Sequence, residues 1–161
     1  MMSARIAELG VETTARSSID YTTFGASVPA CFERAAGLFP NRIAVHCRLG
    51  EITYADLNEA ANRLAHRIVE SGGRAGDRVA ILMPQDRRIF IAMLASLKAR
   101  RIVVVLNGQD PPARIAQLLD DAEPTVVLTI DRCLAQAKEI AGGRLVVIDV
   151  DALEELSLIH I

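Results

Sequence analysis

The sequence predicts an α/β fold in which a mainly parallel sheet carries helices on both faces. The core must be aliphatic, because hydrophobic residues make up 51% of the chain and aromatic residues only 4%, a balance typical of sheets rich in Val, Ile and Leu. Short aliphatic runs also alternate with segments whose apolar residues recur every three or four positions. Parallel strands joined by right-handed helical crossovers account for this alternation.

The first predicted elements are a short helix and a hairpin. Residues 29–38 have the apolar spacing of an amphipathic helix, which Pro40 and Asn41 end. Residues 43–47 and 51–53 indicate two short strands, and the tight connection between them predicts that they pair with each other.

A long helix is predicted to follow the hairpin over residues 54–71. Thr53 and Asp56 form a variant of the capping box, in which each side chain satisfies a free backbone N–H at the start of the helix. Gly72 and Gly73 close the helix, because glycine readily adopts the left-handed conformation. The apolar face, which we expect to lie on a sheet, consists of Leu57, Ala60, Ala61, Leu64, Ala65 and Ile68.

A strand, a helix and another strand come next. Residues 78–83 are apolar at every position after Arg78, which predicts a strand buried on both faces. A helix over about residues 86–99 and a strand at residues 102–106 repeat the unit. The residues expected to point inward from this helix are Ile89, Phe90, Met93, Leu94 and Leu97.

The last predicted unit begins at Asp110, which we expect to cap a helix. Pro111 and Pro112 suit the first turn of that helix. Its apolar stripe consists of Ile115, Leu118 and Leu119. The remaining predicted elements are a strand at residues 125–130, a helix at 131–141 and a strand at 145–150.

The charge pattern excludes several classes of function. Lys and Arg number 18 and Asp and Glu number 20, and their interspersion predicts no nucleic-acid partner. The densest basic cluster, Lys98, Arg100 and Arg101, falls at a predicted helix end, where cations complement the helix dipole. No apolar run approaches the roughly 18 residues that span a bilayer, and residues 1–27 lack the apolar centre of a secretory signal. We therefore expect a cytoplasmic protein without membrane insertion.

The cysteines and histidines do not indicate a disulfide, metal or catalytic site. Cys31, Cys47 and Cys133 are odd in number and widely spaced, so we expect reduced thiols rather than disulfides or a zinc knuckle. His46 beside Cys47 would point to the opposite face of a strand, and His66 has no evident partner for general-base chemistry.

The glycines and the adjacent carboxylates also do not indicate a nucleotide-binding or catalytic site. Gly72, Gly73 and Gly76 follow a predicted helix and precede a strand, whereas a dinucleotide-binding turn needs its glycines between a strand and the next helix. The adjacent carboxylates diverge as surface charges; they are Asp120 with Asp121 and Glu154 with Glu155. We therefore assign no catalytic, cofactor-binding or metal-binding residue within this sequence.

Three segments, at residues 50–68, 76–84 and 97–107, resemble the opening of the adenylate-forming (AMP-binding) ligases. This superfamily includes acyl-CoA synthetases and the adenylation domains of nonribosomal peptide synthetases. The matching residues are Thr53, Tyr54, Leu57, Leu97, Lys98 and Ala99. We assign structural roles to three of them: Thr53 as a helix cap, Tyr54 as a packed aromatic and Leu57 as a core residue.

The resemblance implies ATP-dependent activation of a carboxylic acid. It implies an acyl-adenylate, Mg²⁺ as the counterion of the phosphates, and transfer of the acyl group to the thiol of CoA or of a phosphopantetheinyl carrier protein. The family's phosphate loop and catalytic residues are expected beyond residue 161, so the chain alone is predicted to be inactive. The alternatives are a stand-alone α/β binding or interaction module without catalysis, and an unrelated doubly wound nucleotide-binding domain.

The sequence also departs from the family pattern. Arg100 and Arg101 stand where glycine commonly follows Leu-Lys-Ala, and a left-handed helix end costs more without glycine. Val103, Val105 and Asn107 replace an aromatic, a proline and an acidic residue, which indicates a divergent branch and weakens the analogy with amino-acid-activating domains.

The expected domain organisation has three parts. We expect residues 1–27 to be a partly disordered leader and residues 28–156 to be the truncated N-terminal part of an AMP-binding (adenylation) domain. We interpret residues 157–161 as a non-native tail.

Overall fold

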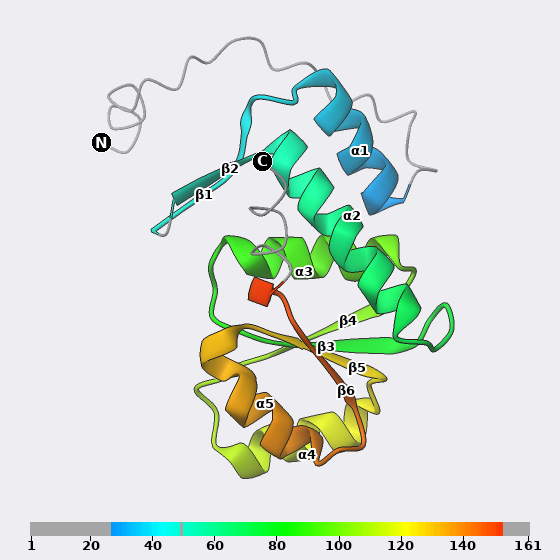
Figure 1. Ribbon diagram of the computed structural model, residues 1–161, viewed down its shortest axis with the longest axis vertical. Coiled ribbons are helices and arrows are strands. Elements are labelled where there is room, and N and C mark those ends of the chain that lie inside the picture. Colours follow the sequence, from blue (N-terminus) through cyan, green and yellow to red (C-terminus); the bar gives the residue numbers. More distant parts are fainter. Residues whose placement is uncertain (1–26, 49, 153–161) are drawn as a thin grey trace, which may run out of the picture.

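The computed structural model describes residues 27–48 and 50–152 (Figure 1). The helices are α1 (Val28–Leu38), α2 (Tyr54–Glu70), α3 (Arg87–Lys98), α4 (Pro112–Ala122) and α5 (Leu134–Ala141), with a 3-10 turn, η3 (Asp131–Cys133), before α5. The strands are β1 (Ile43–Cys47), β2 (Gly50–Thr53), β3 (Arg78–Leu82), β4 (Ile102–Leu106), β5 (Val126–Thr129) and β6 (Val146–Asp149). Apart from Ser27, the predicted leader lies outside the described residues, as does the predicted tail at 157–161.

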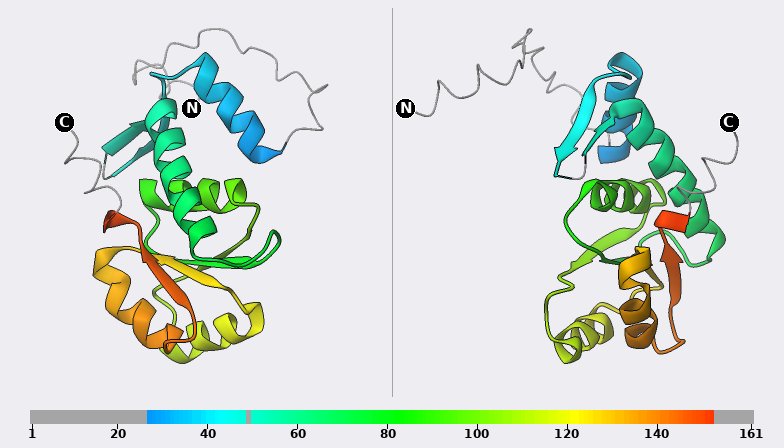
Figure 2. Two further views of the ribbon diagram at one scale, coloured as in Figure 1. Left: turned by 45° about the vertical axis from the view of Figure 1, so that its right-hand side comes forward. Right: turned by 60° about the vertical axis from the view of Figure 1, so that its left-hand side comes forward.

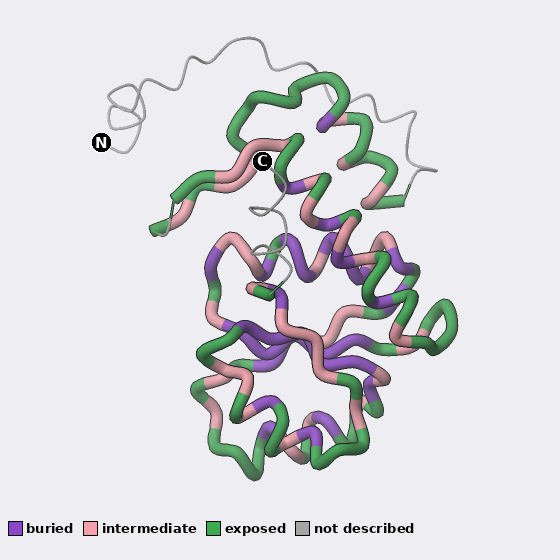
Figure 3. The backbone as a smooth tube through the Cα atoms, in the orientation of Figure 1, coloured by how far each residue is buried: buried purple, intermediate pink, exposed green. Residues whose placement is uncertain are grey.

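A four-stranded parallel sheet forms the centre of the fold, in the order β4-β3-β5-β6. The central strands β3 and β5 are buried along their whole length after Arg78, which confirms the prediction of strands covered on both faces. Figure 3 shows this burial at the middle of the molecule, while the outer helices and the hairpin are largely exposed. The predicted antiparallel pairing of β1 with β2 is also confirmed.

Helices cover both faces of the sheet, as predicted (Figure 1). Alternate residues of β3 point to opposite sides, so Val79 and Ile81 belong to one hydrophobic cluster and Ala80 and Leu82 to the other. The first cluster lies under α3 and α2, and the second lies against α4 and α5.

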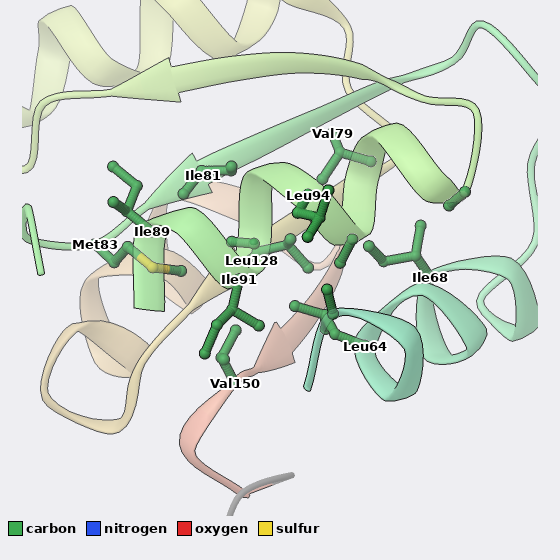
Figure 4. Close-up of a cluster of buried hydrophobic side chains, with 14 of the residues drawn as sticks. Leu64, Ile68, Val79, Ile81, Met83, Ile89, Ile91, Leu94, Leu128 and Val150 are labelled. Atoms are coloured by element: carbon green, nitrogen blue, oxygen red, sulfur yellow. The ribbon is translucent and has the colours of Figure 1, made fainter. Parts of the chain in front are cut away.

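Helix α2 packs mainly on α3, whereas the sequence predicted that it would lie on a sheet. Leu64 and Ile68 of α2 share a cluster with Ile91 and Leu94 of α3 (Figure 4). The physical reason is that α3 already covers this face of the sheet, so the apolar stripe of α2 is buried in a further layer.

The inward face of α3 was predicted wrongly in part. Phe90 is 47% exposed and Met93 and Leu97 are half-buried, whereas Ile91, which was not predicted to be inward, is only 1% exposed. The buried arc instead includes three small residues, Ala92, Ala95 and Ser96. Small side chains allow a helix held between the sheet and α2 to approach both closely, so the inward face is not the one with the largest side chains.

The caps of two helices differ from expectation. Thr53 Oγ1 accepts a hydrogen bond from Asp56 N (3.1 Å), as predicted, but Asp56 Oδ2 accepts from the Thr53 hydroxyl (2.7 Å) rather than from a backbone N–H. Asp110 does not cap α4, since its carboxylate accepts a hydrogen bond from Asn107 Nδ2 (3.0 Å). Pro111 takes the capping position, and Pro112 in the first turn has no N–H for Asp110 to satisfy.

The basic cluster lies at the C-terminal end of α3, as predicted, and it also makes tertiary contacts. Lys98 forms an ion pair with Glu33 of α1. Arg101 is buried, donates from Nη2 to the carbonyl oxygen of Gly72 (2.7 Å) and pairs through Nη1 with Asp77 Oδ2 (3.3 Å). The cluster therefore joins α3 to α1 and to the turn before β3.

None of the helices that the structure describes combines the length and the apolar character needed to cross a bilayer.

Candidate functional site

The carboxyl ends of β3 and β5 are where this fold would place a ligand. The chain runs from β3 outward to β4 and then returns on the other side of β3 to form β5. In open α/β sheets, ligands bind outside the carboxyl ends of the strands at such a reversal of strand order. The loops that meet there follow β3, β5 and β6.

A network of ion pairs occupies this position. Arg88, in the first turn of α3, donates from Nη2 to Asp86 Oδ2 (2.5 Å) and from Nε to Asp86 Oδ1 (3.0 Å). Its Nη1 also bonds both carboxylate oxygens of Asp151, at 2.8 and 3.0 Å. Asp151 Oδ2 accepts a further hydrogen bond from Asp131 N (3.3 Å). The loops after β3, β5 and β6 are thus joined through one guanidinium and one carboxylate.

Asp86 and Arg88 are both held in their charged forms. Burial of Asp86 opposes ionisation, but hydrogen bonds from the Arg88 side chain and backbone, with the charges of Arg88 and Arg132, hold the pKa of Asp86 below its ordinary value. The hydrogen bond to Asp86 raises the pKa of Arg88 further, against burial. Groups held so firmly in their charged forms cannot exchange protons near pH 7, so they do not suit general acid–base catalysis.

The same network is unsuited to phosphate. Asp86 caps α3 by accepting a hydrogen bond from Arg88 N (2.9 Å), so a carboxylate already occupies the position in which a helix N-terminus would bind an anion. An ATP phosphate placed there would meet the negative charges of Asp86 and Asp151. The N-terminus of α3 is therefore occupied by the protein's own carboxylate.

A buried hydroxyl completes the contact between the two central strands. Thr129, at the end of β5, is fully buried and donates to the carbonyl oxygen of Leu82 (2.9 Å) at the end of β3. The hydroxyl is satisfied within the sheet, so it is not free to act as a nucleophile or as a ligand.

The glycine-rich turn before β3 lies at the opposite end of the sheet. Gly72, Gly73 and Gly76 have positive φ angles of 94°, 84° and 89°, which fits their predicted roles in ending α2 and turning into β3. Asp77 Oδ2 accepts a hydrogen bond from Arg74 N (2.6 Å) within this turn. A backbone donor that could bind phosphate is thus already paired with a carboxylate.

The histidines and paired carboxylates are dispersed. His46 Nδ1 lies 2.7 Å from Glu51 Oε1 across the β1–β2 hairpin, where both side chains are exposed. His66 is exposed on α2, and Asp120 pairs with Arg144 at 3.3 Å. Within residues 27–48 and 50–152, no three His, Cys, Asp or Glu side chains gather as metal ligands would. Glu154 and Glu155 lie outside the described residues.

Sequence reasoning missed the network around Arg88. Asp86 was available as a signal, because an Asp at the predicted start of a helix favours an N-cap. The contact between Arg88 and Asp151 spans 63 positions and depends on how the loop after β6 returns toward α3, so no local pattern indicates it.

The geometry thus shows an open α/β fold with an ion-pair network at the carboxyl ends of its central strands. A family model described as "AMP-binding enzyme" matches residues 32–160, which is most of the chain, and the protein belongs to that family. This confirms the resemblance to the adenylate-forming ligases.

The relatives extend the comparison. The chain is 34% identical over 130 residues to a dimodular nonribosomal peptide synthase of Bacillus subtilis, covering 81% of this chain and 6% of that protein. It is 35% identical over 128 residues to an isonitrile lipopeptide synthase of Mycobacterium tuberculosis, covering 79% and 5%. The chain therefore spans only a small part of these relatives.

Two solved structures share the fold. One is o-succinylbenzoate CoA synthetase of Bacillus subtilis in complex with ATP and magnesium ion, at 27% identity and a TM-score of 0.67, with 76% of this chain and 33% of that chain covered. The other is the Klebsiella oxytoca NpsA N-terminal subdomain in complex with 3-hydroxybenzoyl-AMSN, at 28% identity and a TM-score of 0.66, with 79% and 31% covered. The chain corresponds to about a third of each.

Proposed function

We propose that these residues form the N-terminal part of an ATP-dependent ligase that activates a carboxylic acid as an acyl-adenylate. The acyl group then passes to a thiol, that of CoA or of a phosphopantetheinyl carrier protein. The observation that carries the proposal is the family match over residues 32–160. We also propose that the enzyme works in the cytoplasm.

We further propose that the 161-residue chain alone neither binds ATP nor catalyses the reaction. Arg88 with its two carboxylate partners supports this, because the carboxyl ends of the central strands already hold paired charges. In the o-succinylbenzoate CoA synthetase complex, two thirds of the protein lies outside the matched region. ATP, Mg²⁺ and the acyl substrate would accordingly be held by residues of the ligase outside this chain.

Acid-dependent exchange of labelled pyrophosphate into ATP tests the activity. The 161-residue chain should show no exchange with any of a panel of carboxylic acids. An extended chain, expressed from the native locus through the ligase domain in frame, should show exchange with at least one acid. An extended chain that folds but exchanges with no acid, or a genuine stop directly after codon 161, would remove the assignment as a ligase.

A stand-alone binding or interaction module remains the second candidate. It is favoured by the two hydrophobic clusters, which cover both faces of the sheet within the described residues. Cooperative unfolding of a monomeric 161-residue chain would support the module. A rise in melting temperature with ATP would instead indicate a nucleotide site, because a ligand that binds only the folded state stabilises it.

A further inference from the structure

Strand β4 presents an unpaired hydrogen-bonding edge. Among the described strands it pairs only with β3, and Figure 2 shows it at the rim of the sheet, on the side opposite β6. Ile102 N donates to the carbonyl oxygen of Asp77 (3.0 Å), directly before β3, so the backbone groups of alternate residues of β4 face that strand. The N–H and C=O groups of Val103 and Val105 therefore point away from the sheet.

This edge lacks the features that usually protect an open strand, which are charged side chains and proline. The strand Ile102–Leu106 contains neither, and Ile102 and Val105 are 51% and 48% exposed. Val105 stands where the family pattern has a proline, and proline in a sheet is found where its missing N–H would face outward. Because valine supplies that N–H, the outer edge has a complete set of donors and acceptors.

The edge is complementary to itself. When two copies of β4 run antiparallel with Val104 at the twofold axis, Val103 lies opposite Val105 of the partner subunit, and symmetry repeats the pair. Residues whose backbone groups face each other across an antiparallel ladder exchange both of their hydrogen bonds, so these pairs would form four bonds. Every outward N–H and C=O group of Val103 and Val105 would then be satisfied.

The flanking charges favour antiparallel over parallel pairing. Arg100 is exposed directly before β4, and Asp110 lies just beyond the end of β4. The carboxylate of Asp110 accepts a hydrogen bond from the side-chain amide of Asn107 (3.0 Å), which carries no charge to balance it. Antiparallel pairing brings Arg100 toward Asp110 of the partner subunit, whereas parallel pairing would bring two arginines together.

We propose that a second copy of this chain docks on β4, so that an antiparallel β4–β4 contact joins two central sheets into one continuous sheet with a twofold axis. The inference goes beyond the proposed ligase activity and does not depend on it. Only a short strand of each copy meets at this edge, so we expect a small interface and a dissociation constant of roughly 10–100 µM.

The oligomeric state of the extended chain tests the contact. If the gene stops directly after codon 161, the 161-residue chain is the protein to measure. Sedimentation velocity should give at least about 1.5 times the monomer mass at roughly 200 µM and close to the monomer mass at roughly 1 µM. A protein that stays monomeric at the higher concentration would overturn the proposal.

Three substitutions at Val105 test whether the dimer forms through this edge. Val105→Pro removes one N–H donor from each subunit and should raise the dissociation constant at least about tenfold. Val105→Lys should have a similar effect, because the two lysines would lie diagonally across the contact. Val105→Thr keeps the N–H and the β-branched shape, so its dissociation constant should remain within about threefold of the wild type.

Circular dichroism and thermal unfolding at low concentration identify the variants that keep the native fold. Val105→Lys retains every backbone donor, so it remains informative if the proline variant does not fold. A dimer that is unaffected by Val105→Lys and by a folded Val105→Pro would overturn the proposal, because it would form through another surface.

Amide hydrogen exchange distinguishes a second copy from a strand of the same chain. The amides of Val103 and Val105 should exchange at least about twofold more slowly at roughly 200 µM than at roughly 1 µM, because they exchange from the monomer. Protection that does not change on dilution would overturn the proposal, since the occupant would then belong to the same chain. Unprotected exchange at both concentrations would overturn it as well.

Discussion

Arg100 is the residue at which the departure from the family pattern has a physical cost. It follows α3 with φ at 59°, in the left-handed region that glycine adopts without strain. Its N–H still donates to the carbonyl oxygen of Leu97 (3.0 Å), so the helix ends in the usual way despite the arginine. The sequence predicted this cost from the missing glycine.

Replacing Arg100 with glycine should therefore stabilise the protein. We expect Arg100→Gly to be more stable than Arg100→Ala by about 1 kcal/mol, because alanine keeps the penalty of a β-carbon in the left-handed region. Urea unfolding of both variants measures the difference. Equal free energies of unfolding would show that the left-handed conformation is not strained.

Asp86 links stability to pH. Its pKa is lower in the folded protein than its ordinary value of 3.8, so folding favours the ionised form. This contribution to stability is complete above the ordinary pKa and is lost as the pH falls through the folded pKa. Below about pH 4, the free energy of unfolding should therefore fall more steeply for the wild type than for Asp86→Asn. Parallel pH profiles for the two proteins would contradict the network.

The guanidinium of Arg88 gives the complementary test. Arg88→Met should destabilise the protein by roughly 2–4 kcal/mol, because it leaves the buried Asp86 without its main partner. The double variant Arg88→Met with Asp86→Asn should recover part of this loss, since no uncompensated charge remains. Free energies of unfolding at neutral pH measure both effects, and a double variant less stable than the single one would argue against charge pairing.

Among the elements, β3 and β4 show how position in the sheet decides the role of similar sequences. Both are short aliphatic runs, and both were predicted as strands. Ile81 in the central strand β3 is fully buried, whereas Ile102 at the start of the edge strand β4 is 51% exposed. Periodicity identified the strands, but it did not distinguish the centre of the sheet from its edge, because strand order depends on long-range pairing.

Alanine substitutions should reveal this difference. Ile81→Ala should cost about 3–4 kcal/mol, the lost transfer free energy together with a cavity in the core. Ile102→Ala removes the same groups at the edge and should cost less than about 1 kcal/mol. Thermal or urea unfolding of the pair provides the comparison, and similar losses would mean that the edge is covered by another part of the chain.

Element faces were less predictable than element positions. The inward residues of α2 followed from helical spacing, and Leu57, Ala61, Leu64 and Ile68 are indeed buried. In α3, large side chains such as Phe90 were wrongly predicted to point inward. Ala92 and Ser96 are buried instead, because α2 packs on the side of α3 that faces away from the sheet. Helical spacing thus predicted the buried face of α2 but not that of α3, which lies between the sheet and α2.

At the scale of the whole molecule, exposed apolar surface affects the solubility of the isolated chain. Large hydrophobic side chains remain exposed on α1, α2, α3, the hairpin and both edge strands; they are Val28, Leu38, Phe39, Ile43, Val69, Phe90, Ile102, Val105 and Val146. Exposed apolar patches and open strand edges promote association. Because of this surface, we expect the isolated chain to be poorly soluble.

The isolated 161-residue chain should aggregate in a concentration-dependent manner. The double variant Ile102→Lys with Val146→Lys places a charge on each sheet edge and should raise the soluble fraction, because lysine discourages edge-to-edge pairing. Light scattering after size-exclusion chromatography measures both. A soluble wild-type monomer with a single sharp unfolding transition would contradict the prediction.

The sequence by itself determined the order of elements and the parallel sheet, because helical spacing, aliphatic runs and glycine turns are local properties of the chain. The resemblance of three segments to the adenylate-forming ligases indicated the family. Only the tertiary structure decided that Arg88 joins Asp86 to Asp151, that Arg101 is buried against Asp77, and that β6 lies at an edge beside a groove. These features depend on contacts between residues distant in sequence. Such contacts are set by the packing of whole elements, which no local pattern encodes.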